Sequence, residues 1–130
     1  ILLAPSISFA KDCSVELNPS QIEYLESIWP GHVTVILQAN NSIDSSLKAL
    51  DNSIGIRVSG HLPIIDLLNS FNSLMVSTSA NLSKHPTPNS LTEVKKIFND
   101  PDVAVYAHDN GNALKPSSII DLKSMEYIRE

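Results

Sequence analysis

Short β-prone runs alternate with amphipathic helical segments along this 130-residue chain, and this alternation limits the fold more than any other feature. Such alternation is typical of an α/β layer architecture with a mixed or parallel sheet. We therefore expect one α/β domain over residues 1–130, a length suited to a single core. Strands are predicted over residues 1–4, 33–37, 54–58, 74–76, 103–106 and one or two segments within 117–129, and helices over residues 18–29, 61–71 and from residue 90 onward.

Local signals set the limits of two of these helices. Asn18 is the predicted N-cap, Pro19 takes the first helical position, and the Pro-Gly pair after Trp29 ends the helix. Ser90 and Glu93 match a capping box at the start of the last helix. The strand over residues 74–76 is expected to be buried, and residues 108–116 are expected to form a polar loop.

Composition excludes several classes of protein. The net charge of -5 and the pI near 5.2 give no overall electrostatic footprint for binding a polyanion. No apolar run approaches the length of a membrane span, and the single Cys13 cannot form an internal disulfide. We expect a soluble cytoplasmic protein. No metal site built by the protein is expected, because the four histidines are not paired at ligand spacing: His32, His61, His85 and His108.

Arg57 stands between Ile56 and Val58 in an otherwise apolar predicted strand. An unpaired buried charge is unfavourable, so this guanidinium must be paired or must face a cleft. Its planar fork suits a carboxylate or a phosphate held by two hydrogen bonds. The alternative is an arginine that faces solvent on an edge strand or pairs with an internal aspartate. The strand context alone favours this alternative and the ligand-binding role equally.

The segment STSANLS, residues 77–83, follows a predicted strand and carries four hydroxyls and one carboxamide. Its residue types alone favour a polar turn whose hydroxyls satisfy local backbone groups. The alternative is a binding wall, because Ser77, Ser79 and Asn81 share one side of an extended segment. No hydrolase nucleophile motif and no glycine-rich phosphate loop accompanies this segment.

Four blocks, in this order, resemble the YrdC/TsaC family of L-threonylcarbamoyladenylate synthases: WPGHVTVIL, IGIRVSGH, VSTSANLSKHPTP and PSSIIDL. The resemblance implies a twisted mixed open sheet flanked by helices around a concave cavity, truncated at the N-terminus. It also implies nucleotidyl transfer, in which L-threonine, bicarbonate or CO2 and ATP give threonylcarbamoyl-AMP and pyrophosphate. The product serves the threonylcarbamoyl modification of adenosine 37 in ANN-decoding tRNA, together with other tRNA threonylcarbamoylation proteins.

The same resemblance implies roles for individual residues and needs no protein nucleophile. Arg57 would hold the threonine carboxylate and Ser77 would lie beside the threonine. Mg2+ would arrive with ATP rather than occupy a dedicated protein site. The residues expected at ATP are Ser79 and Asn81 by the phosphates, Ser53 and Thr87 at the rim, and Ser117 on the later loop, with Thr34 a weaker candidate.

The chain departs from the family pattern at its start. ILLAPS begins where the family's chain continues past a segment with a Lys-x-Arg motif, so we expect this chain alone to be inactive. Two smaller departures are Lys84, where glycine is common in the family, and Ser59, where proline is common.

Two alternative functions stay open. One is a non-catalytic remnant or a module that binds double-stranded RNA or tRNA. The other is the YrdC-like part of a hydrogenase-maturation carbamoyltransferase.

Overall fold

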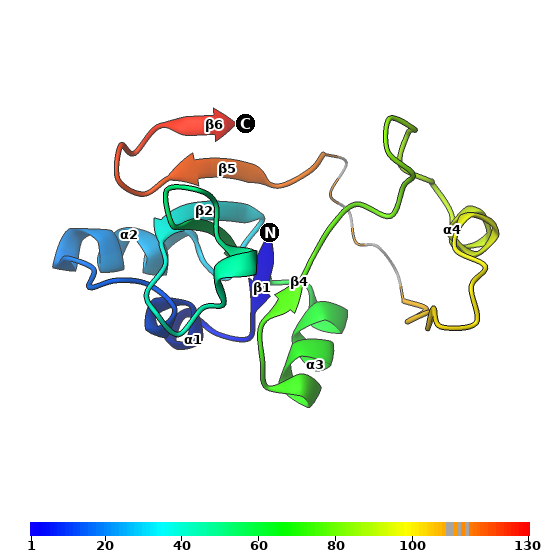
Figure 1. Ribbon diagram of the computed structural model, residues 1–130, viewed down its shortest axis with the longest axis horizontal. Coiled ribbons are helices and arrows are strands. Elements are labelled where there is room, and N and C mark those ends of the chain that lie inside the picture. Colours follow the sequence, from blue (N-terminus) through cyan, green and yellow to red (C-terminus); the bar gives the residue numbers. More distant parts are fainter. Residues whose placement is uncertain (109–110, 112, 114) are drawn as a thin grey trace. The chain divides into compact units, whose positions relative to one another are not determined.

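The computed structural model describes residues 1–108, 111, 113 and 115–130. The chain forms two compact units, which are described separately (Figure 1). Unit 1 comprises Ile1–Ser77 and Gly111–Glu130, and unit 2 comprises Thr78–Asn110. The single domain expected over residues 1–130 stays a prediction. The loop expected over residues 108–116 lies partly outside the described residues.

Unit 1 is built on a six-stranded open sheet with the strand order β4-β1-β3-β2-β5-β6. The pairs β1–β3 and β2–β5 are parallel, whereas β1–β4, β2–β3 and β5–β6 are antiparallel. The predicted mixed open sheet flanked by helices is therefore confirmed. The strands are β1 Leu2–Ala4, β2 Val33–Gln38, β3 Ser53–Val58, β4 Met75–Val76, β5 Ser118–Asp121 and β6 Tyr127–Arg129.

The helices begin where local capping favours them. The Asn18 side chain accepts a hydrogen bond from the Gln21 N–H at 2.9 Å, and the Gln21 side chain accepts one from the Asn18 N–H at 3.0 Å. Within the described residues, no helix is long and apolar enough to cross a membrane. The helices are α1 Ile7–Asp12, α2 Pro19–Ile28 and α3 Leu62–Phe71 in unit 1, with a 3-10 turn at Ser45–Leu47, and α4 Leu91–Ile97 in unit 2.

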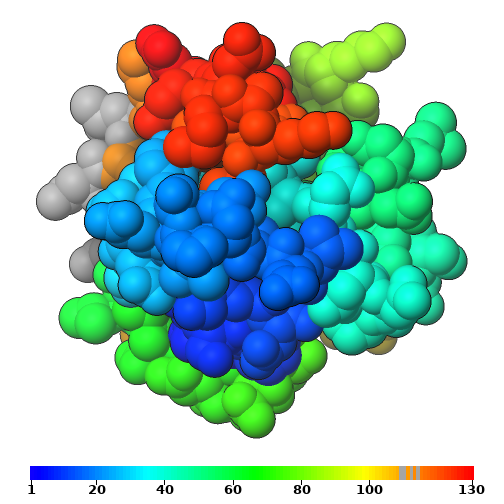
Figure 2. All heavy atoms as spheres, turned by 90° about the vertical axis from the view of Figure 1, so that its left-hand side faces the viewer, coloured from blue at the N-terminus to red at the C-terminus, as the bar shows by residue number. Residues whose placement is uncertain are grey.

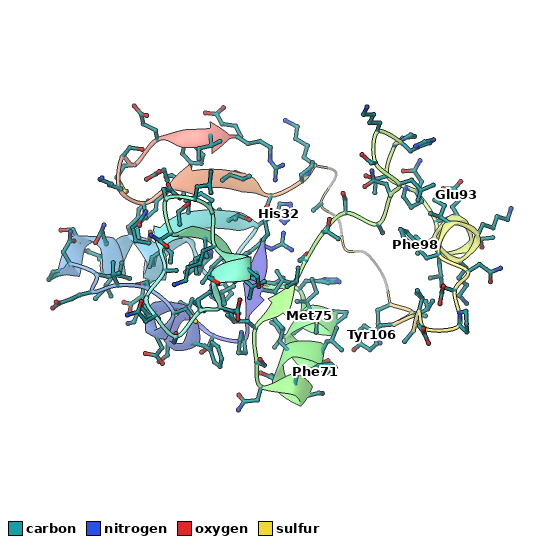
Figure 3. The ribbon with its side chains drawn as sticks, viewed as in Figure 1. His32, Phe71, Met75, Glu93, Phe98 and Tyr106 are labelled. Atoms are coloured by element: carbon teal, nitrogen blue, oxygen red, sulfur yellow. The ribbon has the colours of Figure 1, made fainter. Side chains whose placement is uncertain are left out.

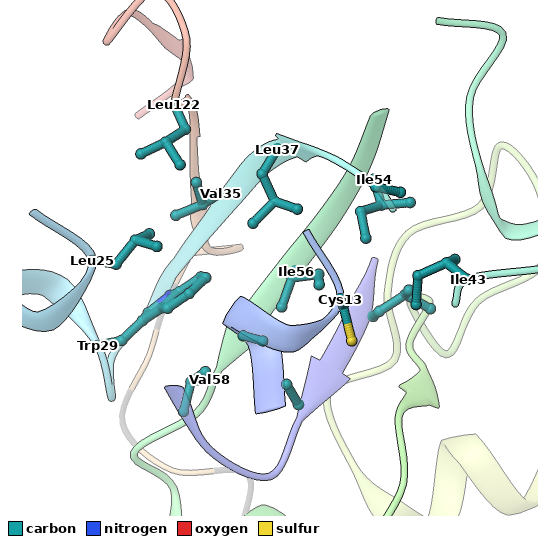
Figure 4. Close-up of a cluster of buried hydrophobic side chains, with 14 of the residues drawn as sticks. Cys13, Leu25, Trp29, Val35, Leu37, Ile43, Ile54, Ile56, Val58 and Leu122 are labelled. Carbon is teal, nitrogen blue, oxygen red and sulfur yellow. The ribbon is translucent and has the colours of Figure 1, made fainter. Parts of the chain in front are cut away.

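One face of the sheet packs against α1 and α2 and forms the core (Figure 4). Leu25 and Trp29 from the α2 side pack with Val35 of β2 and Ile56 of β3 in one buried cluster. The Trp29 indole N–H donates a hydrogen bond of 2.8 Å to the Val33 carbonyl, which satisfies its polar atom inside the core. Figure 2 shows α1 and α2, in blue, on the surface of unit 1 next to the red C-terminal strand.

The polar residues of β3 lie on the opposite face of the sheet. In β3 the buried residues Ile54, Ile56 and Val58 alternate with Ser53, Gly55 and Arg57, which are half-buried. Successive side chains of a strand point to opposite faces, so the second set shares the face turned away from α1 and α2. This arrangement places Arg57 outside the apolar core while keeping it on a central strand.

Three features differ from the sequence-based expectation. Residues 103–106 form no strand, because no described segment of unit 2 pairs with them, and β propensity without a partner does not make a strand. The strand expected to be buried at residues 74–76 is the two-residue edge strand β4, whose Val76 is 64% exposed. Helix α1 was not predicted, although Ser6 caps it by accepting from the Phe9 N–H at 3.1 Å.

Candidate functional site

Arg57 lies on the central strand β3 of unit 1, near the C-terminal end of the strand. Its Nε atom is buried, and none of the described residues accepts a hydrogen bond from it. Burial lowers the pKa of the Arg57 guanidinium below its usual value, because the charged form loses hydration. A buried donor without an acceptor is unfavourable, so this position fits a ligand that brings an anionic oxygen.

Thr34 and Ser117 lie at the same end of the sheet as Arg57. The antiparallel pair Val35 and Ile56 sets the register of β2 and β3, and one further step places Thr34 across from Arg57 on the open face. The Thr34 and Ser117 hydroxyls share a buried hydrogen bond of 2.9 Å. Three of the sequence-predicted site residues are thus brought together in unit 1.

Arg129 and His32 hold the segment that carries Ser117, and neither residue was predicted to belong to the site. Both Arg129 Nε and Nη2 donate to the Ser117 carbonyl oxygen, at 3.0 and 2.6 Å. The His32 Nε2 atom lies 2.9 Å from the Lys115 carbonyl oxygen, and Figure 3 shows His32 near the start of β5. These contacts depend on the pairing of β5 with β2 and β6, which no short sequence motif reveals.

Ser77 lies two strands away from Arg57, at the end of β4. Its N–H donates a hydrogen bond of 2.8 Å to the Ile1 carbonyl. Leu3 of β1 pairs with Met75 on one side and with Arg57 on the other. At the usual strand spacing, Ser77 is therefore offset from the Arg57 strand by roughly 10 Å across the sheet.

Ser53 lies at the other end of β3. It is four residues from Arg57, or roughly 13 Å along an extended strand. Its N–H donates to the Asp51 carboxylate at 3.0 Å. A hollow of about 600 Å³ surrounds it, and the lining includes Glu16, Gln38 and Asp121. The structure therefore does not bring Ser53 next to Arg57.

Unit 2 contains the remaining predicted residues, Ser79, Asn81 and Thr87. Ser79 and Asn81 line a hollow of about 990 Å³ formed entirely by this unit, whereas the exposed Thr87 does not. Both amide hydrogens of Asn81 are used, because Nδ2 donates to the Leu82 and His85 carbonyls at 3.0 and 2.8 Å. Asn81 Oδ1 is buried without a partner among the described residues. The proposed roles of all these residues stay predictions.

Comparison with known sequences identifies relatives of the chain. A family described as "Telomere recombination", Sua5_yciO_yrdC, matches residues 1–130. A protein named threonylcarbamoyl-AMP synthase from Vibrio parahaemolyticus serotype O3:K6 is 31% identical over 115 residues, which are 88% of this chain and 62% of the relative. One of the same name from Aliivibrio fischeri gives the same identity and coverage. The chain thus spans about three fifths of the length of these relatives.

Solved structures share the fold. Escherichia coli YciO superimposes with a TM-score of 0.85 at 24% identity, over 99% of this chain and 64% of that protein. Pyrococcus abyssi Sua5, solved as a complex with L-threonine, gives a TM-score of 0.75 at 20% identity, over 94% of this chain and 36% of that protein. Because the family model matches the entire sequence, the chain belongs to the Sua5/YciO/YrdC family.

Proposed function

We propose that this chain supplies threonine- and ATP-binding residues of an L-threonylcarbamoyladenylate synthase. The enzyme would convert L-threonine, bicarbonate or CO2 and ATP into threonylcarbamoyl-AMP and pyrophosphate. Relatives about 30% identical are named threonylcarbamoyl-AMP synthase, and a structural neighbour was solved with L-threonine. The product would serve the modification of adenosine 37 in ANN-decoding tRNA.

The observation that carries this proposal is the unpaired Nε of Arg57 on the open face of the sheet. A guanidinium whose charge is partly desolvated gains most from a carboxylate, because the fork donates two parallel hydrogen bonds to it. Amino-acid substrates present such a carboxylate. We assign Arg57 to the threonine carboxylate and Ser77 to the neighbouring polar groups of threonine.

The reaction requires positioning more than a protein nucleophile. The threonine amine adds to CO2 to form a carbamate and releases a proton, and a carbamate oxygen then attacks the α-phosphorus of ATP. The bond from the α-phosphorus to the bridging oxygen breaks, and pyrophosphate leaves with its electron pair. Holding the reactants in line accounts for much of the acceleration in such transfers.

Mg2+ is proposed to accompany ATP as a counter-ion of the phosphates. Among the residues that the structure describes, no group of three or more His, Cys, Asp or Glu side chains could hold a metal ion. Mg2+ often keeps several water ligands and binds through substrate phosphates. Such an ion would be held mainly by ATP and water, with no dedicated protein site.

Pyrophosphate release tests the proposal directly. We would assay the 130-residue chain and the product of the complete open reading frame that encodes it, with ATP and Mg2+, and add threonine and bicarbonate singly and together. Release that needs both threonine and bicarbonate is expected from the complete product and not from the chain alone. Folded complete product without this double dependence would refute the assignment. Binding of tRNA, measured at two salt concentrations, tests the RNA-binding alternative.

A further inference from the structure

The His32 ring, just before β2, has one nitrogen in a contact and one without. Its Nε2 atom lies 2.9 Å from the Lys115 carbonyl oxygen. A carbonyl oxygen only accepts hydrogen bonds, so Nε2 carries the hydrogen, and Nδ1 of the neutral ring has the free lone pair. Within the described part of the chain, Nδ1 has no hydrogen-bond partner. The contact with Lys115 therefore selects the tautomer whose Nδ1 can accept a proton.

His32 lies beside the end of β3 that carries Arg57. The Gly31 N–H donates a hydrogen bond of 2.8 Å to the Val58 carbonyl, so the residue before His32 is bonded to the residue after Arg57. Thr34, two residues beyond His32, lies across from Arg57 in the register of β2 and β3. Diagonal neighbours on paired strands are roughly 7–8 Å apart, a separation that long and aromatic side chains span. His32 and Arg57 are therefore neighbours at this end of the sheet.

The His32 ring and the Thr34 side chain lie on the open face of the sheet, the face turned away from α1 and α2. They are two residues apart, and side chains at this spacing point to one side of an extended segment. Both also contact residues 115–117, because the Thr34 hydroxyl bonds to that of Ser117 at 2.9 Å and His32 contacts Lys115. His32 is exposed, and Figure 3 shows it near the start of β5. The imidazole is thus accessible from the face that carries Arg57.

The step proposed for threonine needs a proton acceptor. When the free amine adds to CO2, the nitrogen lone pair forms the N–C bond and a C–O bonding pair moves onto oxygen. The nitrogen then carries a surplus proton, and a base that removes it commits the adduct to the carbamate. With the threonine carboxylate on Arg57, the amine is on the adjacent carbon and so lies at this end of the sheet.

His32 offers the basic atom for this step. The guanidinium groups of Arg57 and Arg129 stay protonated, and the Thr34 and Ser117 hydroxyls bond to each other. Among these described side chains, the imidazole is the one that can act as a base near neutral pH. Because His32 is exposed, its proton can pass on to water.

We propose that His32 is the general base of carbamate formation, with Nδ1 taking the surplus proton directly or through one water. The step leaves a carbamate anion and a protonated imidazole, which returns its proton to the solvent. The inference rests on the proposed function and adds a catalytic residue to it. Arg57 holds the substrate in this scheme, whereas His32 acts on the reacting nitrogen.

The variant His32→Gln separates the base from the contact with Lys115. The amide nitrogen of glutamine takes the place of Nε2 and can donate to the Lys115 carbonyl, but glutamine has no basic atom. In the complete gene product, kcat for pyrophosphate release with threonine and bicarbonate should fall about 100-fold, the lower end of the usual effect of a general base, while the KM for ATP should not change. The Ser117 amide resonance of the 130-residue chain should keep its position, because the segment is still held. Activity equal to that of the unaltered protein would overturn the proposal.

The variant His32→Ala removes both the base and the contact with Lys115. It leaves a space at the site, so added imidazole should raise its activity by about tenfold or more. Imidazole should not raise the activity of His32→Gln, whose side chain fills the space, or of the unaltered protein. A His32→Ala protein that does not respond to imidazole would mean that His32 only positions residues 115–117. If circular dichroism shows that His32→Ala does not fold, the result with His32→Gln decides.

The assay of the unaltered complete product separates this inference from the proposed function. Release that needs both threonine and bicarbonate, but is equally fast in His32→Gln, would keep the synthase and refute the general base. Folded unaltered protein that shows no dependence on threonine and bicarbonate would refute both.

Discussion

Thr34 and Ser117 are 83 residues apart in sequence, yet their hydroxyls share a hydrogen bond of 2.9 Å in a fully buried position. Thr34 belongs to β2, and Ser117 immediately precedes β5, the parallel neighbour of β2. The bond therefore joins the residue just before β5 to β2, and β2 is the neighbour of β3, the strand that carries Arg57. A polar pair at this place therefore links the stability of the sheet to the geometry of the candidate site.

The variant Thr34→Val should destabilise unit 1. Valine keeps the shape of threonine but removes the hydroxyl, which leaves the buried Ser117 hydroxyl without this partner. The expected loss in the free energy of unfolding is about 1–3 kcal/mol, the usual effect of orphaning a buried polar group. Urea unfolding followed by circular dichroism measures it.

A double-mutant cycle provides the control for this pair. Ser117→Ala alone should also destabilise, while adding it to Thr34→Val should produce less than the sum of the two losses. Ser20→Ala, at an exposed position of α2, should change the free energy of unfolding by less than about 0.5 kcal/mol. Strict additivity of the two buried substitutions would show that the hydroxyls are not coupled.

Arg57→Met should separate function from stability. The substitution removes a guanidinium whose Nε has no partner among the described residues and whose pKa is lowered by burial. We expect the free energy of unfolding to stay within about 1 kcal/mol or to rise, because an apolar side chain needs no counter-charge. In the complete gene product, threonine dependence should weaken far more than ATP binding. Calorimetric titration with each substrate measures the difference.

Arg129→Met is the matched comparison, because the other arginine of the chain is paired. Its Nε and Nη2 atoms both donate to the Ser117 carbonyl, so its loss should destabilise by about 1–3 kcal/mol. Equal destabilisation by the two substitutions would mean that Arg57 also has a structural partner, and it would remove the main support for a carboxylate site.

Local sequence signals predicted the elements whose limits are set locally. Asn18 and Pro19 specify the start of α2, and Pro30 and Gly31 specify its end, so this helix was predicted within one residue. Strand propensity cannot reveal a partner, and residues 103–106 therefore read as a strand that does not form. The same limit applies to β4, because only the sheet order shows that it is an edge strand.

The candidate site, too, could be predicted from the sequence only in part. The apolar neighbours of Arg57 in its strand indicated an unusual arginine, and its Nε indeed lacks a partner among the described residues. The contacts of Thr34 and Arg129 with Ser117 join segments that are distant in sequence. They depend on the register of three strands, and a single sequence gives no information on such a register.

Stability should depend on pH through Asp51, which precedes β3. Hydrogen bonds from the Ser53 side chain and backbone N–H lower the pKa of the Asp51 carboxyl below its ordinary value of 3.8. A depressed pKa stabilises the folded state above the unfolded value, and this contribution is lost as the pH falls through the folded value. The free energy of unfolding of the native chain should therefore exceed that of Asp51→Asn near neutral pH.

The difference between these two proteins should shrink below about pH 4. Asparagine keeps an oxygen that can accept from the Ser53 N–H, so the comparison isolates the charge. Urea unfolding at several pH values between neutral and acid gives the curve. A difference that does not change with pH would assign the contribution of Asp51 to shape rather than charge.

Gly31 should tolerate no side chain, whereas Gly60 should. A Cβ atom added at Gly31 would overlap the backbone carbonyl oxygen of Ile28 at the end of α2, and the Gly31 N–H donates to the Val58 carbonyl at 2.8 Å. Neither backbone group can move without disturbing the junction of α2 with β3. Gly31→Ala should therefore lower the free energy of unfolding by about 2–3 kcal/mol.

At Gly60 the nearest atoms, all of Pro30, lie 3.7–3.9 Å from an added Cβ. Gly60→Ala should therefore be neutral or stabilise the protein by up to about 1 kcal/mol. The urea midpoints of the two variants measure this difference. A Gly31→Ala protein as stable as Gly60→Ala would show that the junction of α2 with β3 can move to admit a side chain without a loss of stability.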